Sequence, residues 1–167
     1  MNVREVMVDR LTSCKPNTNL ATVAGLMWEN DCGVLPVLDD SGKVVGMITD
    51  RDTCIAVATR HQLASDILVS EVMSSPVYAC HPDDDIQHAL KTMQDGNVLR
   101  LPVINDDGDL EGILSVYGIV LHAGNDNGKK NQVLSAERVV STLKGITEHR
   151  FSKSSGERQN PPRSAHA

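Results

Sequence analysis

Aromatic side chains are scarce in this chain of 167 residues, which has one tryptophan, two tyrosines and one phenylalanine. So few rings argue against a surface that stacks nucleic-acid bases. The 16 Lys and Arg residues are outnumbered by 22 Asp and Glu residues, which gives a formal net charge of −6. Nucleic-acid binding depends on clustered positive charge. We therefore expect no nucleic-acid partner.

Long apolar runs are also missing, and no stretch approaches the roughly 18 residues of a membrane-spanning helix. The first residues, Met1–Glu5, lack the charged-then-apolar pattern of a secretory signal. We expect no membrane association and a cytoplasmic protein.

The four cysteines, Cys14, Cys32, Cys54 and Cys80, form no CxxC motif and have no pair of histidines nearby. Their spacing predicts no metal site. Each lies in an apolar stretch and is expected in or near the core, where a thiol behaves as a small hydrophobic group. Trp28 is likewise expected to pack inside the protein. The sequence contains no nucleotide-binding glycine loop and no evident catalytic constellation, so an enzyme is not expected.

The chain does contain an internal duplication, in which short motifs recur 66 residues apart with no insertion between Val3–Asp52 and Val69–Gly118. The recurring motifs are Glu5-Val6-Met7 with Glu71-Val72-Met73, Cys14-Lys15-Pro16 with Cys80-His81-Pro82, and Leu35-Pro36-Val37 with Leu101-Pro102-Val103. Such self-similarity indicates two copies of one supersecondary unit.

Each copy predicts the element order β-α-β-β-α from its apolar periodicity and turn residues. The first copy predicts strands at Leu11–Cys14, Val34–Leu38 and Val44–Thr49, a helix capped by Asn19, and a helix from Thr49 to about Thr59. The second copy predicts strands at Val77–Cys80, Arg100–Ile104 and Leu110–Ser115 and helices at Ile86–Met93 and Val116–Ala123.

One unit of about 60 residues is marginal alone, so we expect the two to pack sheet to sheet about a pseudo-twofold axis in an α/β (α+β) fold. The predicted units are residues 1–66 and 67–124. Residues 125–150 are expected to form a linker and an amphipathic helix over Ser135–Arg150. Residues 151–167 have little to bury and predict a disordered tail.

The duplicated pattern resembles a tandem pair of cystathionine-β-synthase-type (CBS) domains. The resemblance rests on Leu35-Pro36-Val37, Asp40-Ser41-Gly42 and Gly46–Asp52, with Leu101-Pro102-Val103, Asp106-Asp107-Gly108 and Gly112–Ser115 in the second copy, and covers about residues 3–123. It implies a regulatory module that binds an adenosine-containing ligand between the repeats, usually as a homodimer.

The family's ribose-binding pattern, Ser/Thr-x-x-Asp, stands here as Thr49-Asp50-Arg51-Asp52. The Asp52 carboxylate suits two neighbouring ribose hydroxyls, since charge-assisted hydrogen bonds are strong. The same spacing is also a variant of the helix capping box, and both roles are compatible. Arg51 fits a surface helix residue better than a phosphate ligand.

The resemblance implies that the other repeat completes the Asp52 cleft with backbone and apolar contacts from Ser75, Pro76, Val77, Leu99, Arg100 and Leu101. Two uses fit Arg100: its guanidinium matches phosphate geometry, and it also suits a solvated strand edge. No cofactor is required; the expected regulatory ligand is an adenosine nucleotide or S-adenosylmethionine.

The second copy departs from the pattern, because Gly118 stands where the ribose-binding aspartate is expected, three residues after Ser115. We therefore expect a weaker second cleft, lined by Arg10, Leu11, Gly33, Val34, Ser115 and Gly118. The leading hypothesis is an adenosine-ligand sensor that acts on a partner protein, and the alternative is an interaction module that needs no ligand.

Overall fold

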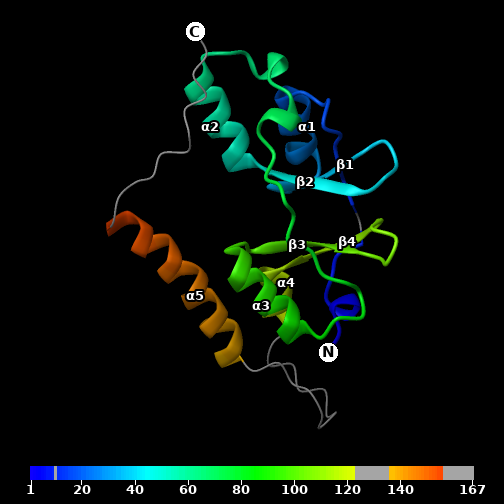
Figure 1. Cartoon of the computed structure of the whole chain (residues 1–167), viewed down its shortest axis with the longest axis vertical. Coiled ribbons are helices and arrows are strands. Elements are labelled where there is room, and N and C mark those ends of the chain that lie inside the picture. The colour runs from blue at the N-terminus through cyan, green and yellow to red at the C-terminus, as the bar shows by residue number, and fades with distance from the viewer. Residues whose placement is uncertain (10, 123–135, 156–167) are drawn as a thin grey trace.

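Two small antiparallel sheets lie in the middle of the molecule, each covered by its own pair of helices (Figure 1). The computed structural model describes residues 1–9, 11–122 and 136–155. The strands are β1 (Val34–Leu38), β2 (Val44–Thr49), β3 (Arg100–Ile104) and β4 (Leu110–Ser115). The helices are α1 (Leu20–Glu29), α2 (Asp50–Arg60), α3 (Ile86–Gly96), α4 (Val116–His122) and α5 (Ala136–Ser155), with 3-10 turns η1 (Val3–Glu5), η2 (Ala64–Asp66) and η3 (Val69–Glu71).

The bounds of all four strands agree with those expected from the sequence. Each hairpin needs a residue in the left-handed region at its turn, and Gly42 and Gly108 supply it with φ of +86° and +84°. In the first hairpin Val34 pairs with Thr49, and in the second Arg100 pairs with Ser115. The two turn signals thus fix which residue lies opposite each strand end.

The strands predicted at Leu11–Cys14 and Val77–Cys80 are wrong as extended elements. Each reduces to a single parallel bridge, Cys14 to Val37 and Cys80 to Val103. Cys14 N–H donates to the Pro36 carbonyl at 3.0 Å, and its own carbonyl accepts from Leu38 N–H at 2.8 Å. Both cysteines are buried, and burial raises the pKa of Cys14 to about 11 and that of Cys80 to about 12.

The two repeats exchange their first segments. Val3 N–H donates to the Asp84 carbonyl at 3.0 Å, and at the corresponding position Val69 N–H donates to the Thr18 carbonyl at 2.8 Å. One core therefore joins Val3 and Val6 to the second repeat, and the other joins Ile67 and Val69 to the first. The sequence units 1–66 and 67–124 are thus interlocked in space.

Contacts between the repeats occur in matched pairs, as a pseudo-twofold axis requires. The bridge from Val8 to Ile113 corresponds to that from Ser74 to Met47. The Sδ atoms of Met7 and Met73 lie close to Gly112 and Gly46, where a Cβ would approach them to 2.7 and 2.5 Å. Glycine at these two positions leaves room for the methionine side chains of the exchanged segments, which a larger residue would displace.

Helix α5 breaks this symmetry, because its main contacts are with α3 and α4 of the second repeat. Val139 and Ile146 are each 2% exposed in the core of the second repeat. The helix continues to Ser155, so residues 151–155 correct the prediction of a tail beginning at 151. The predicted linker up to residue 135 and the tail after 155 lie outside the described residues.

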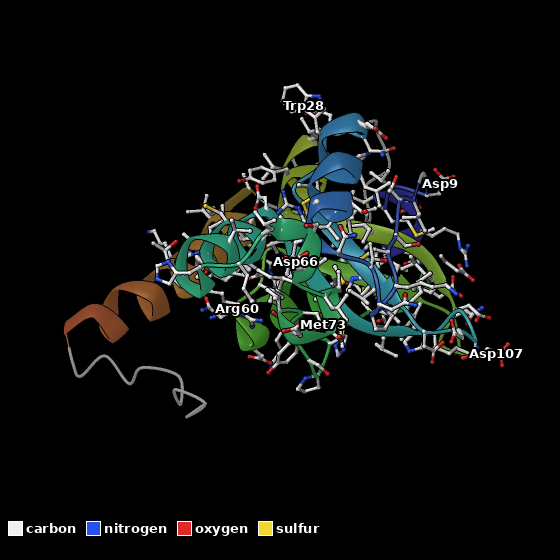
Figure 2. The ribbon with its side chains drawn as sticks, turned by 90° about the horizontal axis from the view of Figure 1, so that it is seen from above. Asp9, Trp28, Arg60, Asp66, Met73 and Asp107 are labelled. Atoms are coloured by element: carbon white, nitrogen blue, oxygen red, sulfur yellow. The ribbon has the colours of Figure 1, made fainter. Side chains whose placement is uncertain are left out.

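Two further expectations are corrected in the first repeat. Trp28, expected to pack inside, is 88% exposed and projects away from α1 (Figure 2). Cys54, expected near the core, is exposed on α2. Helical periodicity places Trp28 one position past buried Met27, on the side of α1 that faces away from the sheet.

Candidate functional site

Thr49 and Asp52 form a closed pair at the start of α2. Thr49 N–H and Oγ1–H donate to Asp52 Oδ2 at 3.1 and 2.7 Å, and Asp52 N–H donates to Thr49 Oγ1 at 3.1 Å. This is the capping box that the sequence allowed. It fixes the carboxylate at the junction of β2 and α2.

The capping box uses only one oxygen of the carboxylate. Within the described part of the chain, no hydrogen bond reaches Asp52 Oδ1, and the side chain is half-buried. Two residues away, Asp50 Oδ1 accepts from Arg51 N–H at 2.7 Å, and Arg51 is exposed. The cap therefore leaves an acceptor oxygen for a further donor.

The exchanged segment of the second repeat runs beside β2. Ser74 and Met47 exchange two backbone hydrogen bonds, of 2.8 and 3.2 Å, immediately before Ser75 and Pro76. Ser75 and Pro76 are joined by a cis peptide bond and are exposed, and Val77 is half-buried. The structure thus holds the predicted segment against the sheet that carries Thr49.

The other three predicted contacts lie elsewhere. Leu101 is fully buried in the core of the second repeat, so its side chain is not available to a ligand. The Leu99 carbonyl accepts from Val116 N–H at 3.0 Å, beside the end of β4. Arg100, expected with Asp52, lies opposite Ser115 in the hairpin and lines the cleft on that side.

That cleft, which we call the Ser115 cleft, has a volume of about 570 Å³ and is formed by both repeats. The structure brings together there the predicted residues Leu11, Gly33, Val34 and Ser115, and adds Arg100. The remaining lining residues are Val8, Thr12, Glu29, Asn30, Asp31, Cys32, Pro36 and Ile113. Arg10, also predicted here, lies outside the described residues.

The Ser115 cleft carries no carboxylate at the ribose position. Ser115 Oγ accepts from Gly118 N–H at 3.0 Å, which repeats half of the capping box of α2. The Arg100 guanidinium lies 5.9 Å from the centre of the Tyr117 ring, within reach of a cation–π contact. Glu29 and Asp31 also line the cleft, which therefore contains both signs of charge.

Several lining residues were missed by sequence reasoning, chiefly the end of α1 and the loop after it, from Glu29 to Cys32. The 66-residue offset could have indicated these residues. Positions 29–32 correspond to positions 95–98, which directly precede Leu99, a residue that the sequence analysis did assign to a cleft. In the second repeat the position of Thr12 is taken by Tyr78, whose ring lies 2.7 Å from where a Cβ on Gly96 would stand. The repeats therefore differ at a position that lines the Ser115 cleft in the first.

Among residues 1–9, 11–122 and 136–155, no three His, Cys, Asp or Glu side chains are grouped to hold a metal ion. None of the helices in those ranges combines the length and apolar character needed to cross a membrane.

The family model for the CBS domain matches residues 3–58 and 69–123. Among curated relatives, CBS domain-containing protein YhcV of Bacillus subtilis is 29% identical over 121 residues, which cover 72% of this chain and 84% of YhcV. The uncharacterized protein MK0525 of Methanopyrus kandleri is 28% identical over 72% of this chain, which spans 61% of the length of that relative.

Two solved structures have the same fold. Hypoxic Response Protein I, with two coordinated zinc ions, is 29% identical with a TM-score of 0.67, covering 73% of this chain and 98% of that one. CBSX2 of Arabidopsis thaliana, in complex with AMP, is 26% identical with a TM-score of 0.63, covering 72% of this chain and 93% of that one.

Proposed function

The chain belongs to the CBS-domain family, and from this premise we propose that it is a regulatory module that senses an adenosine-containing ligand and acts on a partner protein. The ligand class includes AMP, ADP, ATP and S-adenosylmethionine. The observation that carries the proposal is the Thr49–Asp52 pair, which fixes a carboxylate at the end of β2, the strand that Ser74 of the second repeat contacts, and leaves Oδ1 without a partner in the described residues.

The ribose is the part of the ligand that Asp52 would bind. A ribose presents two adjacent hydroxyl donors, and a carboxylate oxygen accepts such bonds strongly. Thr49 holds Oδ2 through two hydrogen bonds, so the carboxylate is oriented before the ligand arrives. A group that is oriented in advance loses little conformational entropy on binding.

The phosphate end of a nucleotide ligand would face the start of α2, where the exposed Arg51 guanidinium matches phosphate geometry. Arg100 has the chemistry for a phosphate but belongs to the Ser115 cleft, so we assign it there as the cation of a second, weaker site.

The proposed sensing depends on the fact that residues of both repeats contribute to the clefts. Both repeats line the Ser115 cleft, and the exchanged segment of the second repeat borders the Asp52 position. A ligand that contacts both repeats stabilises one relative arrangement of them. In a homodimer, which we propose as the working form, that shift would reach the surface that a partner protein recognises.

Calorimetry with AMP, ATP and S-adenosylmethionine tests the proposal on wild type and Asp52→Ala. Each lost charge-assisted bond costs roughly 1.5–3 kcal/mol, or about tenfold to a hundredfold in affinity. Loss of the cap costs only about 1 kcal/mol of stability, so the variant remains folded. Asp107→Ala, which removes a carboxylate at the far hairpin tip, is the matched control (Figure 2). Absence of binding heat from all three ligands at millimolar concentration would refute the proposal.

A second candidate function is an interaction module that needs no ligand. Gly118 favours it, because the second repeat has lost the ribose-binding carboxylate. This alternative predicts partner binding that is constitutive and equal in wild type and Asp52→Ala. Enzymes also occur among the similar proteins. Homoserine O-acetyltransferase of Methanobrevibacter ruminantium is 30% identical over 113 residues, but these residues cover only 22% of that protein. We propose regulation, not catalysis, for this chain.

A further inference from the structure

Three charged side chains line the Ser115 cleft, Arg100 from the second repeat and Glu29 and Asp31 from the first. Arg100 is half-buried, and the two acids are exposed. Although both signs of charge line one cleft, none of the three takes part in an ion pair with another described residue. The Tyr117 ring contacts the Arg100 guanidinium but carries no charge to neutralise it. The cleft therefore offers one cation and two anions to a bound molecule.

Glu29 stands where the fold itself gains nothing from a carboxylate. It is the last residue of α1, and negative charge is unfavourable at the C-terminus of a helix. The corresponding acid of the second repeat, Asp95, is compensated by Lys91, whose Nζ lies 3.0 Å from Asp95 Oδ2. In the first repeat Gly25 takes the position of Lys91. The duplication thus shows a paired carboxylate in one copy and, within the described residues, an unpaired one in the other.

Asp31 shows the same contrast between the repeats. It has a φ of +48°, and Asn97 at the corresponding position has a φ of +52°. Asn and Asp both adopt this left-handed conformation, so the backbone does not distinguish them. The neutral amide of Asn97 is sufficient for the turn in the second repeat, whereas the first repeat adds a second negative charge to the lining of the cleft. The two acids are therefore better explained by a ligand than by the fold.

The remaining chemistry of the cleft selects the class of ligand. A guanidinium binds a carboxylate through two parallel hydrogen bonds, and a carboxylate binds an ammonium group. A free amino acid carries both of these groups on one carbon atom. Val8, Leu11, Val34 and Ile113 also line the cleft and provide apolar contacts for a side chain. A nucleoside lacks its ribose anchor here, because Gly118 replaces the aspartate.

We propose that the Ser115 cleft binds a free amino acid with an apolar side chain. Its carboxylate pairs with Arg100, its ammonium group pairs with Glu29 and Asp31, and its side chain contacts the apolar lining. The volume of about 570 Å³ lies within the roughly 300–1,000 Å³ of small-molecule sites. Because the cation and the two anions come from different repeats, the bound amino acid connects the repeats.

This inference goes beyond the proposed function, since it gives the second cleft a ligand of another class and does not depend on Asp52. Titration of AMP on the same preparations keeps the two apart. Amino-acid binding without AMP binding refutes only the adenosine proposal, and AMP binding without amino-acid binding refutes only this inference. S-adenosylmethionine joins an amino-acid group to adenosine and serves as a third ligand. If it binds while the free amino acids do not, this inference is overturned.

Calorimetric titration of the full chain with L-leucine and L-methionine tests the inference. We expect saturable binding of at least one of them, with one molecule per chain. Leucine methyl ester has no carboxylate, and N-acetyl-leucine has no ammonium group; the corresponding derivatives of methionine serve in the same way. Each derivative should bind at least about tenfold more weakly than the free amino acid, because it loses one charge-assisted contact.

Two variants remove the charges from the protein side. Arg100→Gln and the double variant Glu29→Gln/Asp31→Asn should each weaken amino-acid binding at least about tenfold. Their matched controls are Arg4→Gln and the double variant Asp106→Asn/Asp107→Asn, which change the net charge equally at exposed positions outside the cleft.

Both controls should bind the amino acid as wild type does. The inference is overturned if neither amino acid binds at millimolar concentration or if the derivatives bind as well as the free amino acids. It is also overturned if Arg100→Gln and the double acid variant keep wild-type affinity, or if the controls lose as much affinity as they do.

Discussion

Lys43 and Asp109 occupy the same position in the two repeats, 66 residues apart, and Lys43 Nζ lies 2.7 Å from Asp109 Oδ1. Their backbones also form an antiparallel bridge. A pseudo-twofold axis that exchanges the repeats exchanges these two residues, so their contact lies on that axis. Opposite charges there hold the two hairpins together, whereas the same charge at both positions would repel.

Charge reversal tests this contact. Lys43→Asp places two carboxylates on the axis and should lower the melting temperature, and Asp109→Lys should do the same with two ammonium groups. The double variant restores opposite charges and should recover most of the loss. Thermal unfolding of the four proteins gives the coupling between the residues. Additive losses would show that the pair does not connect the hairpins.

The same contact predicts a pH dependence. Hydrogen bonds from Lys43 and then Asn105 lower the pKa of Asp109. A carboxylate with a lowered pKa stabilises the fold above its unfolded value, about 3.9, and that contribution is lost as the pH falls through the folded value. Wild type should therefore lose more stability on acidification below about pH 4 than Asp109→Asn does.

Urea unfolding at several pH values measures this difference. Asp107→Asn removes a carboxylate from the same turn and serves as the control, since its acid profile should follow that of wild type. Parallel profiles for wild type and Asp109→Asn would exclude the contact as a source of acid sensitivity.

Much of the fold follows from the sequence because its signals are local. Asp39–Gly42 and the matching turn of the second repeat set the hairpin registers, and Asn19 begins α1 by accepting from Thr22 N–H at 2.9 Å. The Thr49–Asp52 pair is also local, so its geometry was expected. What the sequence did not predict depends on contacts between distant segments.

Arg100 illustrates the limit for the candidate site. Its position at the start of a strand was predicted, but which cleft it lines depends on how the two sheets meet, and that is set by the exchanged segments. The recurring motifs beside Val3 and Val69 fit packing on either repeat, so the sequence left the exchange open. Trp28 was misplaced because a large aromatic side chain usually packs in a core, and periodicity alone does not show which side of a helix is free.

The exchanged segments carry a stability prediction. Val3 and Val69 are both fully buried, each in the core of the other repeat, not of the repeat to which its sequence belongs. Val3→Ala and Val69→Ala should each cost roughly 1.5–3 kcal/mol, from lost apolar burial and the cavity that remains. Val8→Ala, in the same segment but at a side chain that is 55% exposed, should change stability by less than about 0.5 kcal/mol. Equal effects for Val3→Ala and Val8→Ala would show that the first segment is not part of the core.

The last prediction concerns the difference between the clefts. Gly118→Asp restores the Ser-x-x-Asp pattern of the second repeat. A Cβ at residue 118 would make ordinary van der Waals contacts, 3.4 Å from Ser115 Oγ and 3.5 Å from the Val6 carbonyl oxygen. The change should not destabilise the fold, because a carboxylate suits the first turn of a helix and replacing glycine reduces the entropy of the unfolded chain.

If the missing carboxylate is what weakens the Ser115 cleft, Gly118→Asp should raise the stoichiometry of adenosine-ligand binding from one per chain toward two. The cleft already has a volume of about 570 Å³ and contains Arg100 as a cation for a phosphate. Gly118→Ala is the control, because it removes the same glycine without adding a carboxylate and should leave the stoichiometry at one. Calorimetric titration measures both variants against wild type. A wild-type chain that already binds two ligands would show that the aspartate is dispensable in this cleft, and a folded Gly118→Asp chain that still binds one would show that the shape of the cleft, not its missing carboxylate, keeps the ligand out.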